Sequence, residues 1–176
     1  MDIRDWNKFQ DYLLNTRKNF WNNDYLSFLI ESVWKIDKPV KVIDFGCGYG
    51  FMGLILMPLL PQGSTYTGID IADQLLNTGK KLFEKTDYHS KFIHADLLEY
   101  SIQEKYDLAI CQSVLRHIPS YSIVLQKMIS SVVPGGKVIC FEINRRIENS
   151  GLYIEGKEES IFLNDENMQK KWREEL

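Results

Sequence analysis

One short stretch decides the fold: VIDFGCGYG, residues 42–50, in which an apolar run leads directly into three alternating glycines. Apolar and β-branched residues that end at a glycine are typical of a buried strand. Glycine adopts backbone angles that other residues avoid, and it lets a ligand approach the main chain. A glycine-rich loop also fits an ordinary tight turn. Its place directly after a strand is what favours a ligand site.

Outward from this stretch, short apolar runs alternate with helical segments. We expect strands at 40–45, 65–69, 91–95, 106–111 and 137–141, and helices at 51–60, 72–85 and 121–131. Alternating strands and helices build a parallel sheet, and right-handed crossovers place helices on both of its faces. The sequence therefore predicts an α/β fold, a doubly wound and mainly parallel sheet of order 3-2-1-4-5 in a three-layer α/β/α sandwich.

The flanks of this core have different compositions. Residues 1–36 carry apolar residues at helical spacing, with one face formed by Trp21, Tyr25, Phe28 and Leu29. They predict an N-terminal helical extension that packs on the sheet, or that additionally forms a lid over the site. Residues 37–143 form the core, and residues 144–176 a polar tail of loop and helix. We expect a single domain overall.

Composition excludes several classes of function. The net charge of −3 and the pI near 5.7 disfavour a nucleic-acid partner. No apolar stretch approaches the roughly 20 residues that span a bilayer, and no secretion signal is apparent, so we expect a cytoplasmic protein without membrane contact. Three unclustered cysteines indicate a reducing compartment. His89 and His94 have no partners at metal-ligand spacing, and no metal is expected.

Acidic residues end three successive strands. Asp44, Asp70 and Asp96 close the first, second and third predicted strands. Because the carboxyl ends of parallel strands share one edge of the sheet, these carboxylates should meet there. Asp70 suits both hydroxyls of a ribose, and Asp96 suits the exocyclic amine of adenine.

Two nucleotide cofactors compete for this arrangement. Residues 48–53 read GYGFMG, which matches the dinucleotide pattern G-x-G-x-x-G, and an acid at Asp70 fits either cofactor. A carboxylate at Asp44, inside the end of the first strand, would repel a pyrophosphate but suits a ligand with cationic centres. The charge argument favours S-adenosylmethionine, and an NAD-dependent oxidoreductase remains an alternative.

Residues 40–142 resemble the class I S-adenosylmethionine-dependent methyltransferases. Beside the glycine-rich loop, YDLAICQ at 106–112 resembles that family's fourth-strand motif, and VPGGK at 133–137 resembles the turn before its fifth strand. The resemblance implies that the loop holds the methionine part, Asp70 the ribose, and Asp96 with Leu97 the adenine. The expected cofactor-binding residues are Asp44, Gly46, Cys47, Gly48, Gly50, Asp70, Ile71, Asp96, Leu97 and Cys111, the last as pocket wall.

Two further residues are candidates for catalysis. His117, after the fourth strand, has a pKa range that suits a general base, but it equally fits a histidine that packs the loop. Glu142 ends the fifth strand and either faces the substrate or pairs with Arg145 or Arg146. Methyl transfer by direct displacement needs no obligatory base, because an aligned acceptor in a dry pocket suffices.

The resemblance fails after the fifth strand, where the family's last strand pair is missing. Only residues 152–154 and 161–163 are weak strand candidates. Either the sequence is shortened, or the sheet ends at an exposed edge that invites a homodimer or another partner. We expect a methyltransferase that acts on a small-molecule acceptor, with the pocket under the N-terminal helix. A non-catalytic cofactor-binding interaction module is the alternative.

Overall fold

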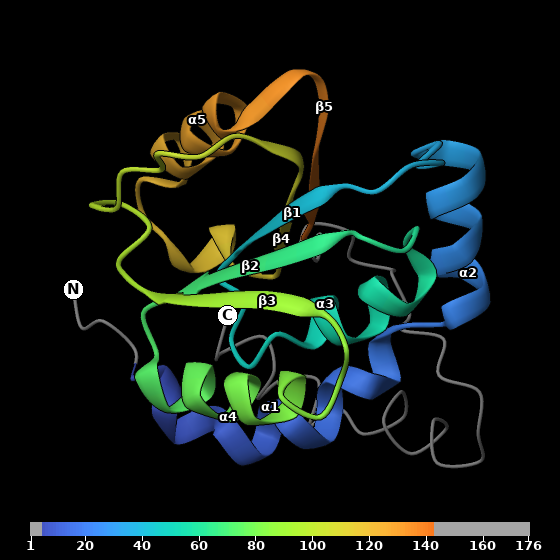
Figure 1. The fold of residues 1–176 in the computed structure, drawn as a ribbon. Coiled ribbons are helices and arrows are strands. Elements are labelled where there is room, and N and C mark those ends of the chain that lie inside the picture. The colour runs from blue at the N-terminus through green and yellow to red at the C-terminus, as the bar shows by residue number, and fades with distance from the viewer. Residues whose placement is uncertain (1–4, 143–176) are drawn as a thin grey trace, which may run out of the picture. The chain divides into compact units, whose positions relative to one another are not determined.

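A five-stranded sheet organises the computed structural model, which describes residues 5–142. The strand order is β3-β2-β1-β4-β5, and every neighbouring pair is parallel (Figure 1). The predicted fold class and strand order are confirmed. The strands are β1 (Lys41–Phe45), β2 (Thr65–Asp70), β3 (His89–His94), β4 (Tyr106–Gln112) and β5 (Val132–Phe141).

Helices cover both faces of this sheet, as a doubly wound fold requires. In Figure 1, α4 and α1 lie together on one side and α5 lies on the other. The core helices are α3 (Phe51–Leu56), its 3-10 extension η4 (Met57–Leu59), α4 (Asp73–Phe83), the 3-10 turn η5 (Leu115–His117) and α5 (Tyr121–Ser131). The N-terminal elements are η1 (Trp6–Phe9), α1 (Gln10–Thr16), η2 (Arg17–Phe20), α2 (Asn23–Phe28) and the π-helical turn η3 (Leu29–Val33).

Alternating side chains of the strands build one core on each face. Val42 of β1 packs in a cluster with Leu56 of α3, whereas Phe45 of the same strand packs in a second cluster with Val124 of α5. Because successive residues of a strand point to opposite faces, one apolar strand serves both cores. The carboxyl-terminal ends of the strands are thereby held in fixed positions relative to one another.

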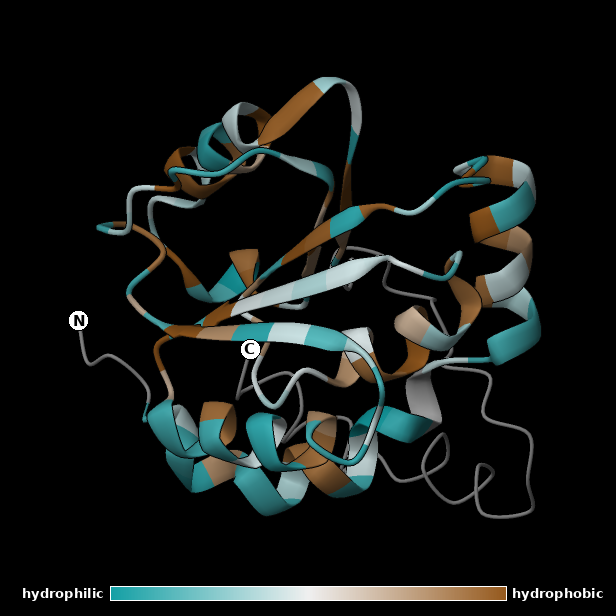
Figure 2. Cartoon of the chain, viewed as in Figure 1, coloured by the Kyte–Doolittle hydropathy of each residue, from teal (hydrophilic) through white to brown (hydrophobic). Residues whose placement is uncertain are grey.

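Helix α4 illustrates how the sequence brings a helix close to the sheet. Its ribbon alternates between hydrophilic and hydrophobic bands (Figure 2), and its inner face buries Leu75, Leu76 and Phe83. Gly79 lies on the same face, where an added Cβ would come within 2.8 Å of the carbonyl oxygen of Tyr49. The missing side chain therefore lets α4 support the glycine-rich loop directly.

The N-terminal extension is helical, but its buried face differs from the predicted one. Tyr25 and Phe28 are 57% and 52% exposed, and their rings stack on each other at 6.3 Å between centroids. The buried residues are Leu26, Leu29 and Ile30. These three share a face at helical spacing, and that aliphatic face packs on the core while the rings of Tyr25 and Phe28 stay at the surface.

The start of β5 also corrects the prediction. The strand begins at Val132, whereas the sequence suggested a turn at 134–136 and a start at residue 137. Tyr106 pairs with Val132 and Leu108 pairs with Lys137, so β5 carries extra residues in a bulge. Gly135, at φ +81°, adopts the left-handed conformation that such a bulge needs.

Several expectations concern residues that the structure does not describe. The polar tail of 144–176, with its strand candidates at 152–154 and 161–163, lies outside the described residues. Within residues 5–142, β3 and β5 are the edges of the sheet. Across the same range, no helix combines the length and the apolar character needed to cross a bilayer.

Candidate functional site

The glycine-rich loop joins β1 to α3 and turns at the carboxyl edge of the sheet. The backbone N–H groups of Gly46 and Cys47 both donate to the carbonyl oxygen of Ile69, at 2.8 and 3.0 Å. Gly46 has φ +72°, and a Cβ there would lie 2.5 Å from a methyl carbon of Val114. A Cβ at Gly48 would meet only Leu75, at 3.9 Å. The loop is therefore packed at its start and open at Gly48.

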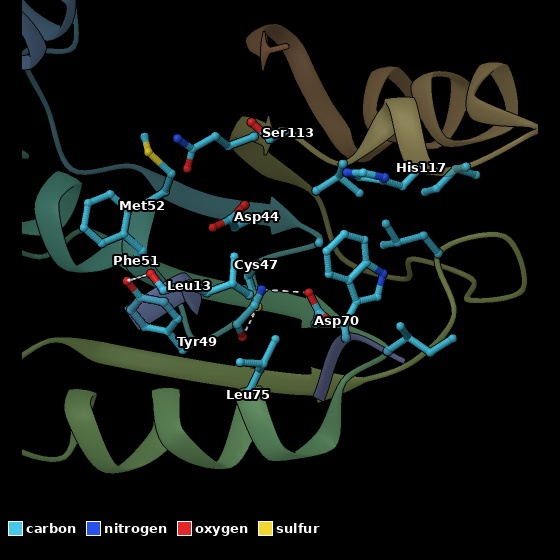
Figure 3. A pocket seen from close by; sticks show the side chains of 18 of the residues that line it. Leu13, Asp44, Cys47, Tyr49, Phe51, Met52, Asp70, Leu75, Ser113 and His117 are labelled. Atoms are coloured by element: carbon cyan, nitrogen blue, oxygen red, sulfur yellow. Dashed lines mark hydrogen bonds between the residues drawn. The ribbon is translucent and has the colours of Figure 1, made fainter. Parts of the chain in front are cut away.

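Asp70, at the end of β2, anchors this loop. One carboxylate oxygen accepts the N–H of Gly48 at 2.7 Å (Figure 3), and the other accepts the N–H of Ala72 at 2.8 Å. Burial raises the pKa of Asp70, and the hydrogen bonds from Ala72 and Gly48 oppose that rise. Because a carboxylate has about four acceptor positions, Asp70 holds the loop and retains capacity for ligand hydroxyls.

Asp44, at the end of β1, is a buried carboxylate only 2% exposed. The hydroxyl of Tyr66 donates to it at 2.8 Å. Burial raises the pKa of Asp44 to about 7; the hydrogen bond from Tyr66 opposes this and the nearby charge of Asp70 adds to it. Among the described residues no lysine, arginine or histidine forms an ion pair with Asp44. This position therefore favours a cationic group of a ligand.

A cavity of about 200 Å³ lies at these strand ends. Figure 3 shows Asp44 and Asp70 reaching it from neighbouring strands, Leu75 from α4, and Ser113 and His117 from the segment after β4. The lining residues are Trp6, Leu13, Arg17, Asp44, Gly46, Cys47, Gly48, Tyr49, Phe51, Met52, Asp70, Ile71, Leu75, Asp96, Leu97, Leu98, Gln112, Ser113, Val114, His117, Ile118 and Pro119.

All predicted cofactor-binding residues line this cavity except Gly50 and Cys111, and these two are corrections. Gly50 is buried at the start of α3, where an added Cβ would meet the ring of Phe83 at 3.0 Å. Cys111 packs in the core on the face covered by α5. Because side chains alternate along a strand, Gln112 reaches the cavity instead.

Asp96 begins a tight turn after β3. One of its carboxylate oxygens accepts the backbone N–H of Leu98 at 2.8 Å, and its carbonyl oxygen accepts those of Glu99 and Tyr100. Leu97 is 7% exposed and lines the cavity beside it. The turn therefore presents an acidic and an apolar side chain together.

The two catalytic candidates separate in the structure. His117 lines the cavity, where its ring meets Trp6 edge-on at 4.7 Å and its Nε2 accepts a hydrogen bond from Nε of Arg116 at 3.0 Å. Glu142 does not line the cavity, which corrects the expectation that it faces the substrate.

The carboxylate of Glu142 has a different use. One of its oxygens accepts the backbone N–H groups of Val114 and Leu115, both at 2.8 Å. It thus satisfies the first amides of η5 and holds the turn that carries His117. Its alternative partners, Arg145 and Arg146, lie outside the described residues.

The N-terminal extension contributes lining residues that the sequence analysis did not name as site residues. Trp6, Leu13 and Arg17 line the cavity, so η1, α1 and η2 cover it, rather than the helix around Tyr25. Among the described residues that line the cavity, Arg17 is the only lysine or arginine, and burial lowers its pKa. The four-residue spacing of Leu13 and Arg17 was the available signal, since it places both on one helical face.

Comparison with known proteins identifies the family. Residues 36–176 match the family model described as a methyltransferase domain. The chain belongs to this family.

Across residues 5–142, no group of three histidine, cysteine or acidic side chains is arranged to hold a metal ion.

Two curated relatives have matching sequences. A demethylmenaquinone methyltransferase of Staphylococcus aureus (strain MRSA252) is 27% identical over 132 residues, which cover 70% of this chain and 54% of the relative. A ubiquinone biosynthesis O-methyltransferase of Rickettsia typhi is 26% identical over 140 residues, 80% of this chain and 56% of the relative. The chain spans about half the length of the curated relatives it matches.

Solved structures have the same fold. The plantazolicin methyltransferase BpumL, in complex with S-adenosylhomocysteine, gives a TM-score of 0.64 at 21% identity over 88% of this chain and 59% of its own. An S-adenosylmethionine-dependent methyltransferase from Clostridium acetobutylicum gives a TM-score of 0.62 at 18% identity. The match covers 77% of this chain and 56% of that protein. The comparisons confirm the expected methyltransferase family and its fold.

Proposed function

We propose that this chain binds S-adenosylmethionine and transfers its methyl group to a small-molecule acceptor by direct displacement. The observation that carries the proposal is Asp44, a buried carboxylate without a cationic partner among the described residues, at the wall of a cavity beside the open glycine loop. Such a carboxylate is stabilised by a ligand that brings positive charge. The ammonium and sulfonium of S-adenosylmethionine supply it.

The other polar residues of the cavity fit the remaining parts of this ligand. Asp70 would accept hydrogen bonds from the ribose hydroxyls, and Asp96 one from the adenine amine, with Leu97 against the base. Arg17 would balance the carboxylate of the methionine part, since no other lysine or arginine within residues 5–142 lines the cavity. Acidic groups at one position and a cation at another match a zwitterion.

The same charges disfavour NAD. A pyrophosphate at the glycine-rich loop would lie beside two acidic side chains, Asp44 and Asp70. In the described part of the lining, Arg17 is the one lysine or arginine that would oppose their repulsion. Dinucleotide sites instead place phosphates against backbone N–H groups at a helix N-terminus. Here the N–H of Gly48 already donates to Asp70.

When bound, the cofactor supplies an electrophilic methyl group on a sulfonium centre. The chain's own contribution is position and exclusion of water: Leu13, Met52, Val114 and Ile118 give the cavity an apolar wall. Gln112 and Ser113, at the end of β4, offer polar groups that orient an acceptor. The names of the two curated relatives support a small molecule as the acceptor class.

His117 is the one candidate that can move a proton at this wall. Its Nε2 accepts the hydrogen bond of Arg116, so taking a proton from an acceptor there requires Arg116 to release it. Direct displacement proceeds without this step when the acceptor is already nucleophilic. His117 is therefore proposed as an auxiliary base.

Parallel calorimetric titrations with S-adenosylmethionine, S-adenosylhomocysteine and NAD test the proposal. We expect micromolar binding of the first two and none of NAD. Asp44→Asn, which keeps the shape but removes the charge, should weaken S-adenosylmethionine, and the exposed Asp37→Asn should not. Binding of NAD alone would instead support an oxidoreductase, and no binding of any of the three would contradict the proposal.

A further inference from the structure

The segment between β3 and β4 is irregular where a doubly wound fold usually has a helix. Residues 95–105 form a turn and irregular chain, yet Asp96, Leu97 and Leu98 line the cavity. The turn at 96–100 has few bonds of its own, chiefly the three N–H groups that Asp96 accepts. A short turn of this kind leaves several carbonyl oxygens in need of donors from elsewhere.

Lys127 of α5 supplies those donors. Its Nζ lies 2.9 Å from the carbonyl oxygen of Leu97, 2.5 Å from that of Leu98 and 3.0 Å from that of Tyr100. An ammonium has three N–H donors, which matches the three acceptors. Figure 1 shows the yellow-green segment after β3 running beside α5.

Within residues 5–142, no acidic side chain forms an ion pair with this ammonium. Among the described residues the ion pairs are those of Lys8 and Lys91, so Lys127 is bound by carbonyl oxygens alone. Its side chain is half-buried. Hydrogen bonds from a charged donor are stronger than neutral ones, and removing the donor leaves acceptors unsatisfied. The conformation of the turn therefore depends on a residue that does not line the cavity.

We infer that Lys127 is a positioning residue for base recognition: by binding the carbonyl oxygens of residues 97, 98 and 100, it holds Asp96 and Leu97 where they select an adenine base. The inference rests on the proposed function, which places adenine at Asp96. It predicts that Lys127 affects discrimination between bases more than it affects the stability of the domain.

The chain offers a matched control in Lys105. This residue ends the same irregular segment, and its ammonium donates to the carbonyl oxygen of Ser130 in the last turn of α5. It also joins the segment to α5 through a lysine and a carbonyl oxygen, but within residues 5–142 its ammonium forms no hydrogen bond with residues 96–98. Lys105→Met should therefore reproduce the loss of a crosslink without disturbing the cavity.

Titrations with S-adenosylhomocysteine and S-inosylhomocysteine measure the discrimination. The inosine analogue replaces the exocyclic amine with an oxygen, which cannot donate to Asp96. We expect the native protein and Lys105→Met to prefer the adenosine ligand by about ten-fold or more, as for one hydrogen bond to a charged acceptor. Lys127→Met should reduce the preference to about three-fold or less, and Lys127→Arg, which keeps a cation, should restore most of it.

A second measurement needs no ligand. Hydrogen exchange at the amide of Leu98, which donates to Asp96, should accelerate about ten-fold in Lys127→Met and stay unchanged in Lys105→Met. Unchanged exchange, or a retained preference in Lys127→Met, would overturn the inference while leaving the proposed function intact. Failure of the native protein to bind either nucleoside would overturn both.

Discussion

Asp44→Asn should abolish a pH dependence of stability that the native protein shows without ligand. The pKa of Asp44 is raised by burial from 3.8 to about 7. Between these values the folded state keeps a proton that the unfolded chain has released, so stability falls as the pH rises. The slope is about 1.4 kcal/mol per pH unit. From pH 5 to pH 8 the native protein should therefore lose about 3 kcal/mol through this group.

Urea unfolding of both proteins at pH 5 and pH 8 measures this effect. Asparagine keeps an acceptor for the hydroxyl of Tyr66 and carries no charge. The free energy of unfolding of the variant, relative to that of the native protein, should therefore rise by about 3 kcal/mol from pH 5 to pH 8. Because the two proteins share every other titrating group, the contributions of those groups to the pH dependence of stability cancel in the comparison. Asp37→Asn, at an exposed position, should follow the native protein. The reasoning would be refuted if the difference in free energy of unfolding between Asp44→Asn and the native protein stayed constant, within about 1 kcal/mol, from pH 5 to pH 8.

Three further predictions concern the same site. Gly46→Ala should destabilise the fold by about 2 kcal/mol or more, because its Cβ would lie 2.5 Å from Val114. Gly48→Ala should destabilise it by only about 1 kcal/mol, because of the positive φ at this position. Thermal unfolding compares the two variants, and equal destabilisation would contradict the packing argument. Asp70→Asn should weaken the binding of S-adenosylhomocysteine by about 2–3 kcal/mol, because both carboxylate oxygens of Asp70 accept backbone N–H groups and the variant lacks the charge. An unchanged dissociation constant would exclude Asp70 from the site. Titration of S-adenosylmethionine at pH 6 in buffers of different ionisation enthalpy should show proton release that is absent in Asp44→Asn, since the bound cation favours the ionised carboxylate.

Local patterns predicted the framework of the site. The alternation of apolar runs and helices predicted a parallel, doubly wound sheet. The acids at Asp44, Asp70 and Asp96 could be assigned to one edge because parallel strands end together. The strand ends are set by nearby glycines and polar residues, so a window of a few residues contains the needed information. This is why most of the expected cofactor residues line the cavity.

The sequence did not indicate which face of β4 borders the cavity. The strand is buried on both faces, so its apolar run lacks the two-residue alternation that marks an inner face. Cys111 was therefore expected at the cavity, whereas Gln112 lines it. The sequence also did not reveal that Glu142 binds the backbone at Val114 and Leu115, because these partners lie 28 and 27 residues away along the chain.

By itself, the sequence determined the class of fold, the loop at Gly46–Gly50 and the convergence of three acids, because these follow from periodicity and from short-range chain geometry. Only the tertiary structure decided that Arg17 joins the cavity, that Lys127 binds the turn at 96–100 and that the pKa of Asp44 rises to about 7. Each of these depends on groups brought together from distant parts of the chain. Burial and charge act through space, and a linear pattern does not encode those distances.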